Sequence, residues 1–158
     1  MGYYEINLKE ISKVTSFSRP TIYNYFQSKE EIFLALITRE FERWNADLTE
    51  IGNIVRGLAI NELADKLAHS LEKRTQLLKL LSCGVAPIEG SGHEELTAFY
   101  KTAYIESMDL LRNIISRFCP WMPSPQDEIF INAFFSVIFT VKSDSPLPFL
   151  TAHTIAFH

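Results

Sequence analysis

Apolar residues recur at helical spacing along most of this chain of 158 residues, and no stretch shows the strict alternation typical of a β-strand. The clearest case is the segment 62–73, in which Leu63, Leu67 and Leu71 share one face of an amphipathic helix. The pattern therefore predicts an all-α fold. The predicted helices span residues 8–14, 19–25, 29–45, 62–73, 76–83, 94–118 and 126–141.

The helix predicted over 126–141 is apolar on nearly every side, so we expect it to be buried on most sides. Its apolar core, 129–141, is interrupted by polar side chains and is shorter than the roughly 20 residues that span a bilayer. We expect no membrane partner. The residues that make this helix so apolar are Ile129, Phe130, Phe134, Phe135, Val137, Ile138 and Phe139.

The cysteines and the start of the chain bear on where the protein works. Cys83 and Cys119 match neither a CxxC motif nor a zinc-ligand spacing, and a chain of this length needs no disulfide or metal to fold. The start lacks the basic and apolar regions of a signal peptide. We expect a cytoplasmic protein whose cysteines are inert small hydrophobic residues, with no metal and no cofactor.

Enzyme signatures are missing from the sequence. It holds no glycine-rich phosphate loop, no GxSxG motif and no HExxH motif, and His93-Glu94-Glu95 lacks a second histidine. We therefore predict no catalytic residues and no enzymatic activity.

Charge is distributed unevenly along the chain, whose formal net charge is −4. Residues 7–29 carry four basic side chains against Glu10 alone, a local balance of +3, whereas residues 45–158 carry nine basic and 13 acidic side chains. Phosphate neutralisation requires positive charge only at the contact face. A basic N-terminal segment followed by an acidic remainder of the chain is therefore compatible with a modular DNA-binding protein.

The segments 8–14 and 19–25 have the form of a helix-turn-helix, because two short helices are joined by a tight break. Ser18 is placed to cap the second helix, and Pro20 falls in its first turn, where the missing N–H costs nothing. Ser28 and Glu31 have the spacing of a capping box that opens the next helix. The second helix is short enough to enter a major groove about 12 Å wide.

The side chains of this second helix divide into two sets. Arg19, Thr21 and Asn24 are expected to be exposed and polar, whereas Ile22 and Phe26 are expected to point inward. Tyr23 and Tyr25 add hydroxyl groups that can reach phosphate. Lys29 lies in the first turn of the following helix, where its ammonium and the free N–H groups can grip one phosphate together.

Residues 7–33 resemble the DNA-binding signature of the TetR family of transcriptional regulators. The matching core is Ser18-x-x-Thr21-Ile22-Tyr23-x-x-Phe26-x-Ser28-Lys29-Glu30-x-Ile32. The resemblance implies a homodimeric repressor that binds a palindromic operator in double-stranded DNA and releases it when a small-molecule effector enters the C-terminal domain. By position, Arg19, Pro20, Thr21 and Asn24 would face bases, with Tyr23, Tyr25 and Lys29 mostly on the DNA backbone.

The resemblance also implies a division into domains. Residues 1–45 would form the helix-turn-helix domain with its connecting helix, and residues 46–158 a helical regulatory and dimerisation domain. In the family another helix precedes the motif, and Gly2-Tyr3 resembles the loop after that helix, so we expect the first domain to be incomplete at its N-terminus. The alternative is a helical dimerisation or interaction module that has lost DNA binding. Residues 142–158 are expected to lack regular structure.

The remaining candidate sites lie in the second domain. His69, Tyr100 and Tyr104 are candidates for lining the effector pocket, since such pockets are mainly apolar with a few polar groups. The alternative is that His69 is a surface residue and the two tyrosines are core residues. The helices predicted over 94–118 and 126–141 are expected to form the homodimer interface.

Overall fold

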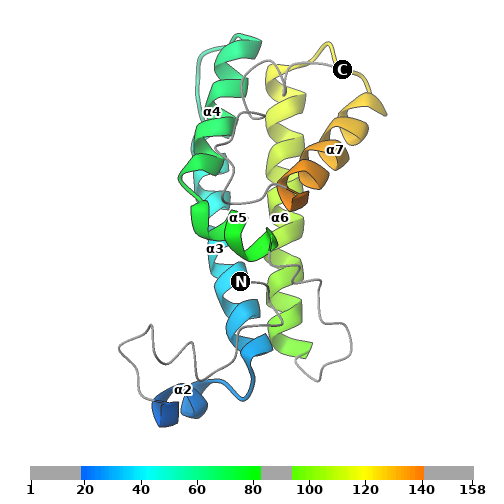
Figure 1. Cartoon of the computed structure of the whole chain (residues 1–158). Helices are drawn as coiled ribbons and strands as arrows, with labels where there is room; N and C mark the ends of the chain where they lie inside the picture. The colour runs from blue at the N-terminus through cyan, green and yellow to red at the C-terminus, as the bar shows by residue number, and fades with distance from the viewer. Residues whose placement is uncertain (1–18, 83–93, 141–158) are drawn as a thin grey trace.

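The computed structural model describes residues 19–82 and 94–140, and all regular structure within them is helical (Figure 1). This confirms the predicted all-α fold. The helix predicted over 8–14 and the tail 142–158 lie outside the described residues. The helices are α2 (Arg19–Tyr25), α3 (Lys29–Gly52), α4 (Ile60–Glu72), α5 (Thr75–Ser82), α6 (Glu94–Phe118) and α7 (Gln126–Thr140).

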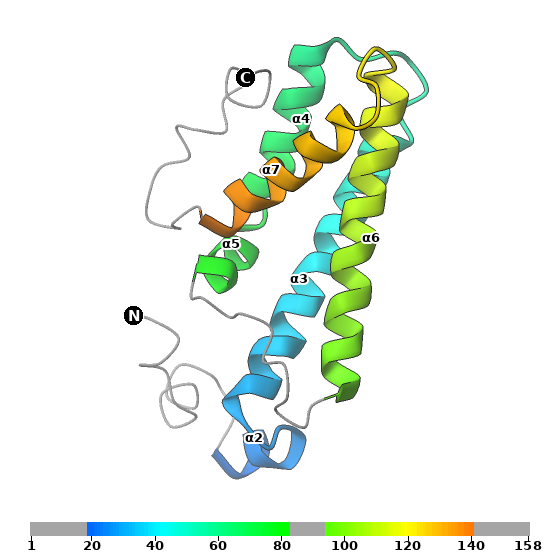
Figure 2. The same cartoon turned by 90° about the vertical axis from the view of Figure 1, so that its right-hand side faces the viewer.

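Two long helices, α3 and α6, run side by side in the same direction and share the most extensive interface of the structure (Figures 1 and 2). The ring of Phe41, at the middle of α3, meets the ring of Tyr100 in the first half of α6. Arg117, in the last turn of α6, bonds to Gly52 at the end of α3. Helices α4, α5 and α7 pack around the half of this pair that is remote from α2. The structure therefore has an elongated body with α2 at one end.

The core is centred on the buried stripe of α3, where Phe41, Trp44 and Leu48 recur at helical spacing and have no exposed surface. Leu67 of α4 and Leu111 of α6 are equally buried and belong to the same cluster. The core thus joins the helices of the body directly to the helix that carries α2.

Helix α3 extends to Gly52, whereas the sequence pattern predicted its end near Asn45. That prediction was wrong because polar residues at the expected end do not interrupt the apolar stripe, which continues through Leu48 and Ile51. At its actual end the guanidinium of Arg117 donates to the carbonyl oxygens of Gly52 and Ile54, at 2.5 and 2.7 Å. Hydrogen bonds from α6, a helix distant in sequence, therefore satisfy carbonyl oxygens at the end of α3.

Helix α7 also departs from expectation. It buries Ile131, Phe134, Phe135 and Ile138, but the side of Ile129 and Val137 is open, with 65% and 38% of these residues exposed. The prediction of burial on most sides is therefore wrong for the single chain, because its neighbouring helices cover only one face of α7. No helix in the described ranges is long and apolar enough to cross a membrane.

Candidate nucleic-acid interface

Helix α2 lies at one end of the molecule, beyond the first residue of α3 and remote from α4 and α7 (Figures 1 and 2). Its bounds, Arg19–Tyr25, are those predicted for the second helix of the helix-turn-helix, with Pro20 in its first turn. With seven residues it is about 10 Å long, since an α-helix rises 1.5 Å per residue. Such a helix is small enough to lie in a DNA major groove.

The described side chains of α2 are accessible to differing degrees. Pro20 and Asn24 are exposed, and 79% of Tyr25 is exposed, whereas Thr21, which was also expected to be exposed, is half-buried. The side chains of Arg19 and Tyr23, like that of Ile22, lie outside the described residues, although their backbone forms part of the helix.

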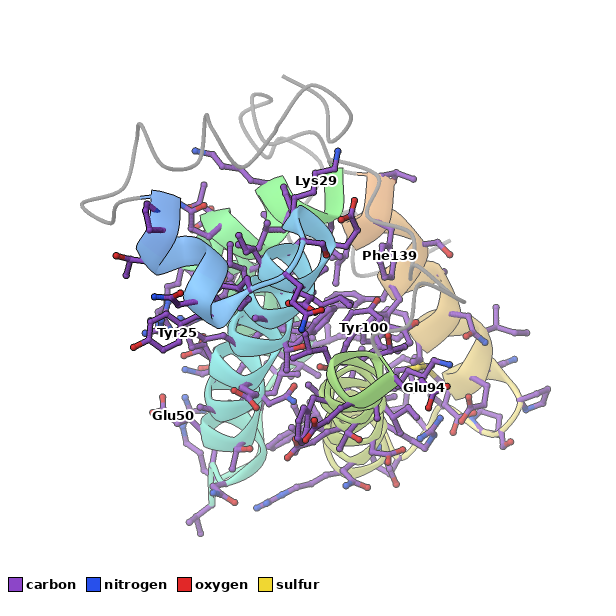
Figure 3. All side chains as sticks on the ribbon, turned by 90° about the horizontal axis from the view of Figure 1, so that it is seen from below. Tyr25, Lys29, Glu50, Glu94, Tyr100 and Phe139 are labelled. Atoms are coloured by element: carbon purple, nitrogen blue, oxygen red, sulfur yellow. The ribbon has the colours of Figure 1, made fainter. Side chains whose placement is uncertain are left out.

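Lys29 lies where α3 begins. Phe26, expected to point inward, is half-buried, as is Lys29. Figure 3 views the molecule from the α2 end and shows Tyr25 and Lys29 projecting outward from the ribbon there. The predicted phosphate-contacting side chains that are described therefore lie at the same end of the molecule as α2.

The junction between α2 and α3 is held by hydrogen bonds from two side chains. The Ser28 hydroxyl accepts from the Glu31 backbone N–H at 3.3 Å, which confirms Ser28 as the N-cap of α3. The Glu31 carboxylate accepts from the backbone N–H of Gln27 at 2.6 Å, one residue before the position expected for a capping box. These bonds fix the direction in which the chain leaves α2 and enters α3.

We expect Ser28→Ala to lower the free energy of unfolding by about 1 kcal/mol, because the first turn of α3 loses its capping acceptor. Urea denaturation followed by circular dichroism measures this difference. Ser116→Ala, on an exposed position of α6, is the matched control and should change stability by less than about 0.5 kcal/mol. Equal effects of the two substitutions would argue against the capping role.

Helix α3 links the α2 end to the core without interruption. Its 24 residues span about 36 Å, and its first half already buries Ile32, Phe33, Leu34 and Ile37. The position of α2 therefore depends on how α3 packs against the rest of the body.

Tyr100 and Tyr104, two of the predicted effector-pocket residues, belong to an aromatic cluster between α3, α6 and α7. Their rings stack on each other with centroids 6.2 Å apart, and Tyr104 meets the edge of Phe135 at 5.3 Å. Burial, reinforced by the neighbouring Tyr104, raises the pKa of Tyr100 to about 12, and burial also raises that of Tyr104. Both hydroxyls are therefore neutral near physiological pH.

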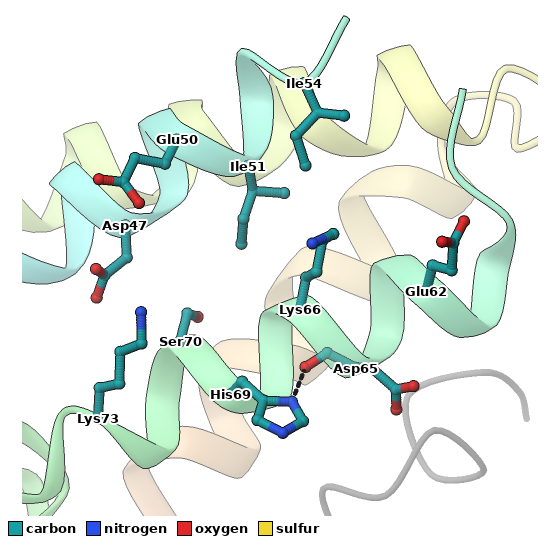
Figure 4. A pocket seen from close by; sticks show the side chains of 10 residues that line it. All are labelled: Asp47, Glu50, Ile51, Ile54, Glu62, Asp65, Lys66, His69, Ser70 and Lys73. Carbon is teal, nitrogen blue, oxygen red and sulfur yellow. Dashed lines mark hydrogen bonds between the residues drawn. The ribbon is translucent and has the colours of Figure 1, made fainter. Parts of the chain in front are cut away.

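His69 lies elsewhere, on an exposed position of α4 beside a groove of about 590 Å³ between α3 and α4 (Figure 4). Its Nδ1 atom is 2.6 Å from the carbonyl oxygen of Asp65. Charged side chains of both signs line most of the groove, whereas small-ligand pockets are usually apolar. Neither tyrosine lines this groove, so the structure does not bring the three predicted pocket residues together.

In the described part of the chain, potential metal ligands do not cluster and the one cysteine is buried. No group of three or more His, Cys, Asp or Glu residues there is arranged to hold a metal ion. Cys119 is buried, and burial raises the pKa of its thiol, as expected for an inert cysteine. Cys83 lies outside the described residues.

Comparison with known proteins places two family matches on the chain. The family described as bacterial regulatory proteins, tetR family, matches residues 1–36, and the tetracyclin repressor-like C-terminal domain matches residues 38–145. A relative from Bacillus subtilis (strain 168), the uncharacterized HTH-type transcriptional regulator YdgC, is 35% identical over 77 residues. This alignment covers 49% of the chain and 39% of the relative's length. No solved structure matches the chain significantly.

Proposed function

Because the chain belongs to the TetR family, we propose that it is a transcriptional regulator that binds double-stranded DNA through α2. The observation that carries this proposal is the placement of α2. The motif-bearing helix lies at one end of the body, with Asn24 and Tyr25 exposed. Its junction to α3 is held by Ser28 and Glu31.

The proposed contacts divide between bases and phosphates. Arg19, Pro20, Thr21 and Asn24 face base edges, where side-chain hydrogen bonds and apolar contacts discriminate between base pairs. Tyr23, Tyr25 and Lys29 contact the phosphate backbone, which positions the helix without reading sequence. The exposure of Tyr25 and the location of Lys29 at the start of α3 support these roles.

The proposed regulator is a homodimer that is joined through α6 and α7 and that binds a palindromic operator through its two copies of α2. The open face of α7 supports this, because Ile129, Ala133 and Val137 recur on it at helical spacing and are exposed in the single chain. In such a dimer the two copies of α2 enter successive major grooves about 34 Å apart.

The proposed regulation is repression released by a small-molecule effector. An effector changes DNA binding only if it favours a conformation of the dimer with a different spacing of the two recognition helices. We propose Tyr100 and Tyr104 as effector contacts because Tyr104 contacts both Phe41 of α3 and Phe139 of α7, and Tyr100 stacks on Tyr104. His69 would contribute only from the separate groove.

We expect Lys29→Ala to weaken binding to all duplex DNA by a similar factor, because a phosphate contact carries no sequence information. The slope of log affinity against log salt concentration should become shallower by about one unit. Fluorescence anisotropy with labelled duplexes at several salt concentrations measures both quantities.

Lys73→Ala is the matched control, since Lys73 is an exposed lysine at the C-cap of α4, a helix remote from α2 (Figure 1). It should leave both the affinity and the salt slope unchanged. Absence of any DNA binding by the folded parent chain would instead favour the alternative function, a helical interaction module without DNA binding.

A further inference from the structure

Two buried polar side chains bridge the long helices α3 and α6. Asn45 is 4% exposed and Ser107 has no exposed surface. The Ser107 hydroxyl donates to Asn45 Oδ1 at 2.6 Å. The Asn45 amide donates to the Ala103 carbonyl oxygen at 3.0 Å. The same amide donates to the Glu106 carboxylate at 3.2 Å. The Asn45 side chain therefore has partners for both its amide group and its carbonyl oxygen.

The other buried polar side chains in the described ranges make different connections. Thr38 donates to the carbonyl of Leu34, and Glu40 pairs with Arg43, so both bonds stay within α3. Ser70 accepts from the Trp44 indole and so joins α3 to α4. Among the buried polar groups in these ranges, Asn45 and Ser107 are thus the two that connect α3 to α6.

The bond from the Ser107 hydroxyl to Asn45 Oδ1 is possible in one axial register of the two helices. A slip of α3 by one turn, about 5.4 Å, would carry Asn45 from Ser107 toward Leu111 or Ala103. Neither side chain can donate a hydrogen bond, so Asn45 Oδ1 would lose its donor and be left unsatisfied in the core. Apolar contacts discriminate less between registers, because aliphatic side chains can repack against one another. A single buried asparagine fixes the register of paired helices in coiled coils for the same reason.

We propose that Asn45 and Ser107 are positioning residues that fix the register of α3 against α6 and thereby the placement of α2. Because α3 is continuous from Lys29 to Gly52, a slip of its packing moves α2 by the same distance. The consequence for DNA rests on the proposed function, whereas the register itself does not.

The contact of Arg117 with the end of α3 does not replace this constraint. Its guanidinium is bonded to the backbone carbonyls of Gly52 and Ile54 in an exposed position. Unpaired carbonyls are present at the end of any helix, so Arg117 can find such a partner in more than one register. If it loses its carbonyl partners, its exposed guanidinium is solvated by water. Arg117 therefore tolerates a slip that Asn45 does not.

The test compares the full chain with the variant Asn45→Leu/Ser107→Ala, in which apolar side chains replace the polar pair. Spin labels at Glu42→Cys on α3 and Asn113→Cys on α6, both exposed positions, report the inter-helix distance in a Cys83→Ser/Cys119→Ala background. The labelled chain is mixed with a large excess of unlabelled chain before the dimer assembles. Most labelled dimers then carry labels on one subunit, so the measured distances lie within that subunit. Pulsed electron resonance should give one narrow distance peak for the parent and a second, displaced peak for the variant.

Ser70→Ala is the matched control, because it removes a buried polar contact between α3 and α4 but none to α6, and it should retain the single peak. Ser107→Ala alone provides a second variant if the double variant does not fold, and its peak should broaden. A single unchanged peak in a folded variant would overturn the proposal.

DNA binding provides a separate measurement. If each subunit populates two registers equally, only about one quarter of dimers hold both recognition helices in place, so DNA affinity should fall about fourfold. If the parent chain binds no DNA, the proposed function fails while the distance result still decides whether the polar pair fixes the register.

Discussion

Replacing Trp44 by alanine is expected to lower the free energy of unfolding by about 3–5 kcal/mol, the range for removing a large aromatic side chain from a packed core. Trp44 has no exposed surface. Its ring stacks on Phe134 with centroids 6.4 Å apart and meets Phe135 at 5.9 Å. Its indole N–H donates to the Ser70 hydroxyl at 3.0 Å, so the substitution also removes a buried hydrogen bond.

Urea denaturation monitored by tryptophan-independent far-ultraviolet circular dichroism measures this loss. Val55→Ala is the control, because Val55 is 93% exposed and its truncation should change stability by less than about 0.5 kcal/mol. A loss below about 1 kcal/mol for Trp44→Ala would contradict the placement of this residue at the centre of the core.

The second large effect concerns sequence recognition. We expect Arg19→Ala to cost about 1–3 kcal/mol of operator binding, equivalent to about a 5- to 150-fold loss of affinity, if its guanidinium contacts a base edge. Affinity for unrelated duplexes should fall much less, so the ratio of specific to non-specific affinity falls. Thr21→Ala should lower this ratio in the same direction.

Arg56→Ala is the matched control for charge, because Arg56 lies between α3 and α4, and its pairing with Glu62 is local. It should leave both affinities near those of the parent chain. If Arg19→Ala binds the operator as the parent does, the assignment of Arg19 to base contact is wrong.

Much of the fold was predictable because helical periodicity reflects the faces that are buried. The bounds of α2 and α6 agree with the segments predicted from it, and Ser28 was recognised as a cap from its residue type and position. The end of α3 was missed because Asn45 is typical of a helix end or an exposed position. In the structure its amide is instead buried and bonded to Ser107 and Ala103.

How well each candidate site could be predicted depends on whether its residues are close together in the sequence. The motif residues are close together in sequence, so local spacing is enough to place them on α2 and at the start of α3. His69 and Tyr100 belong to helices whose relative rotation depends on packing that the sequence does not display. The structure places His69 beside a charged groove and Tyr100 in an aromatic cluster. The effector contacts therefore stay predictions.

The most direct test of the account is selection of random double-stranded DNA by the purified full chain, followed by affinity measurements across a salt series. We expect enrichment of a palindrome whose half-sites are about one helical turn apart, with affinity that falls steeply as salt rises. Recovery of no sequence from chain shown to be folded would contradict sequence-specific DNA binding. It would favour a helical interaction module instead.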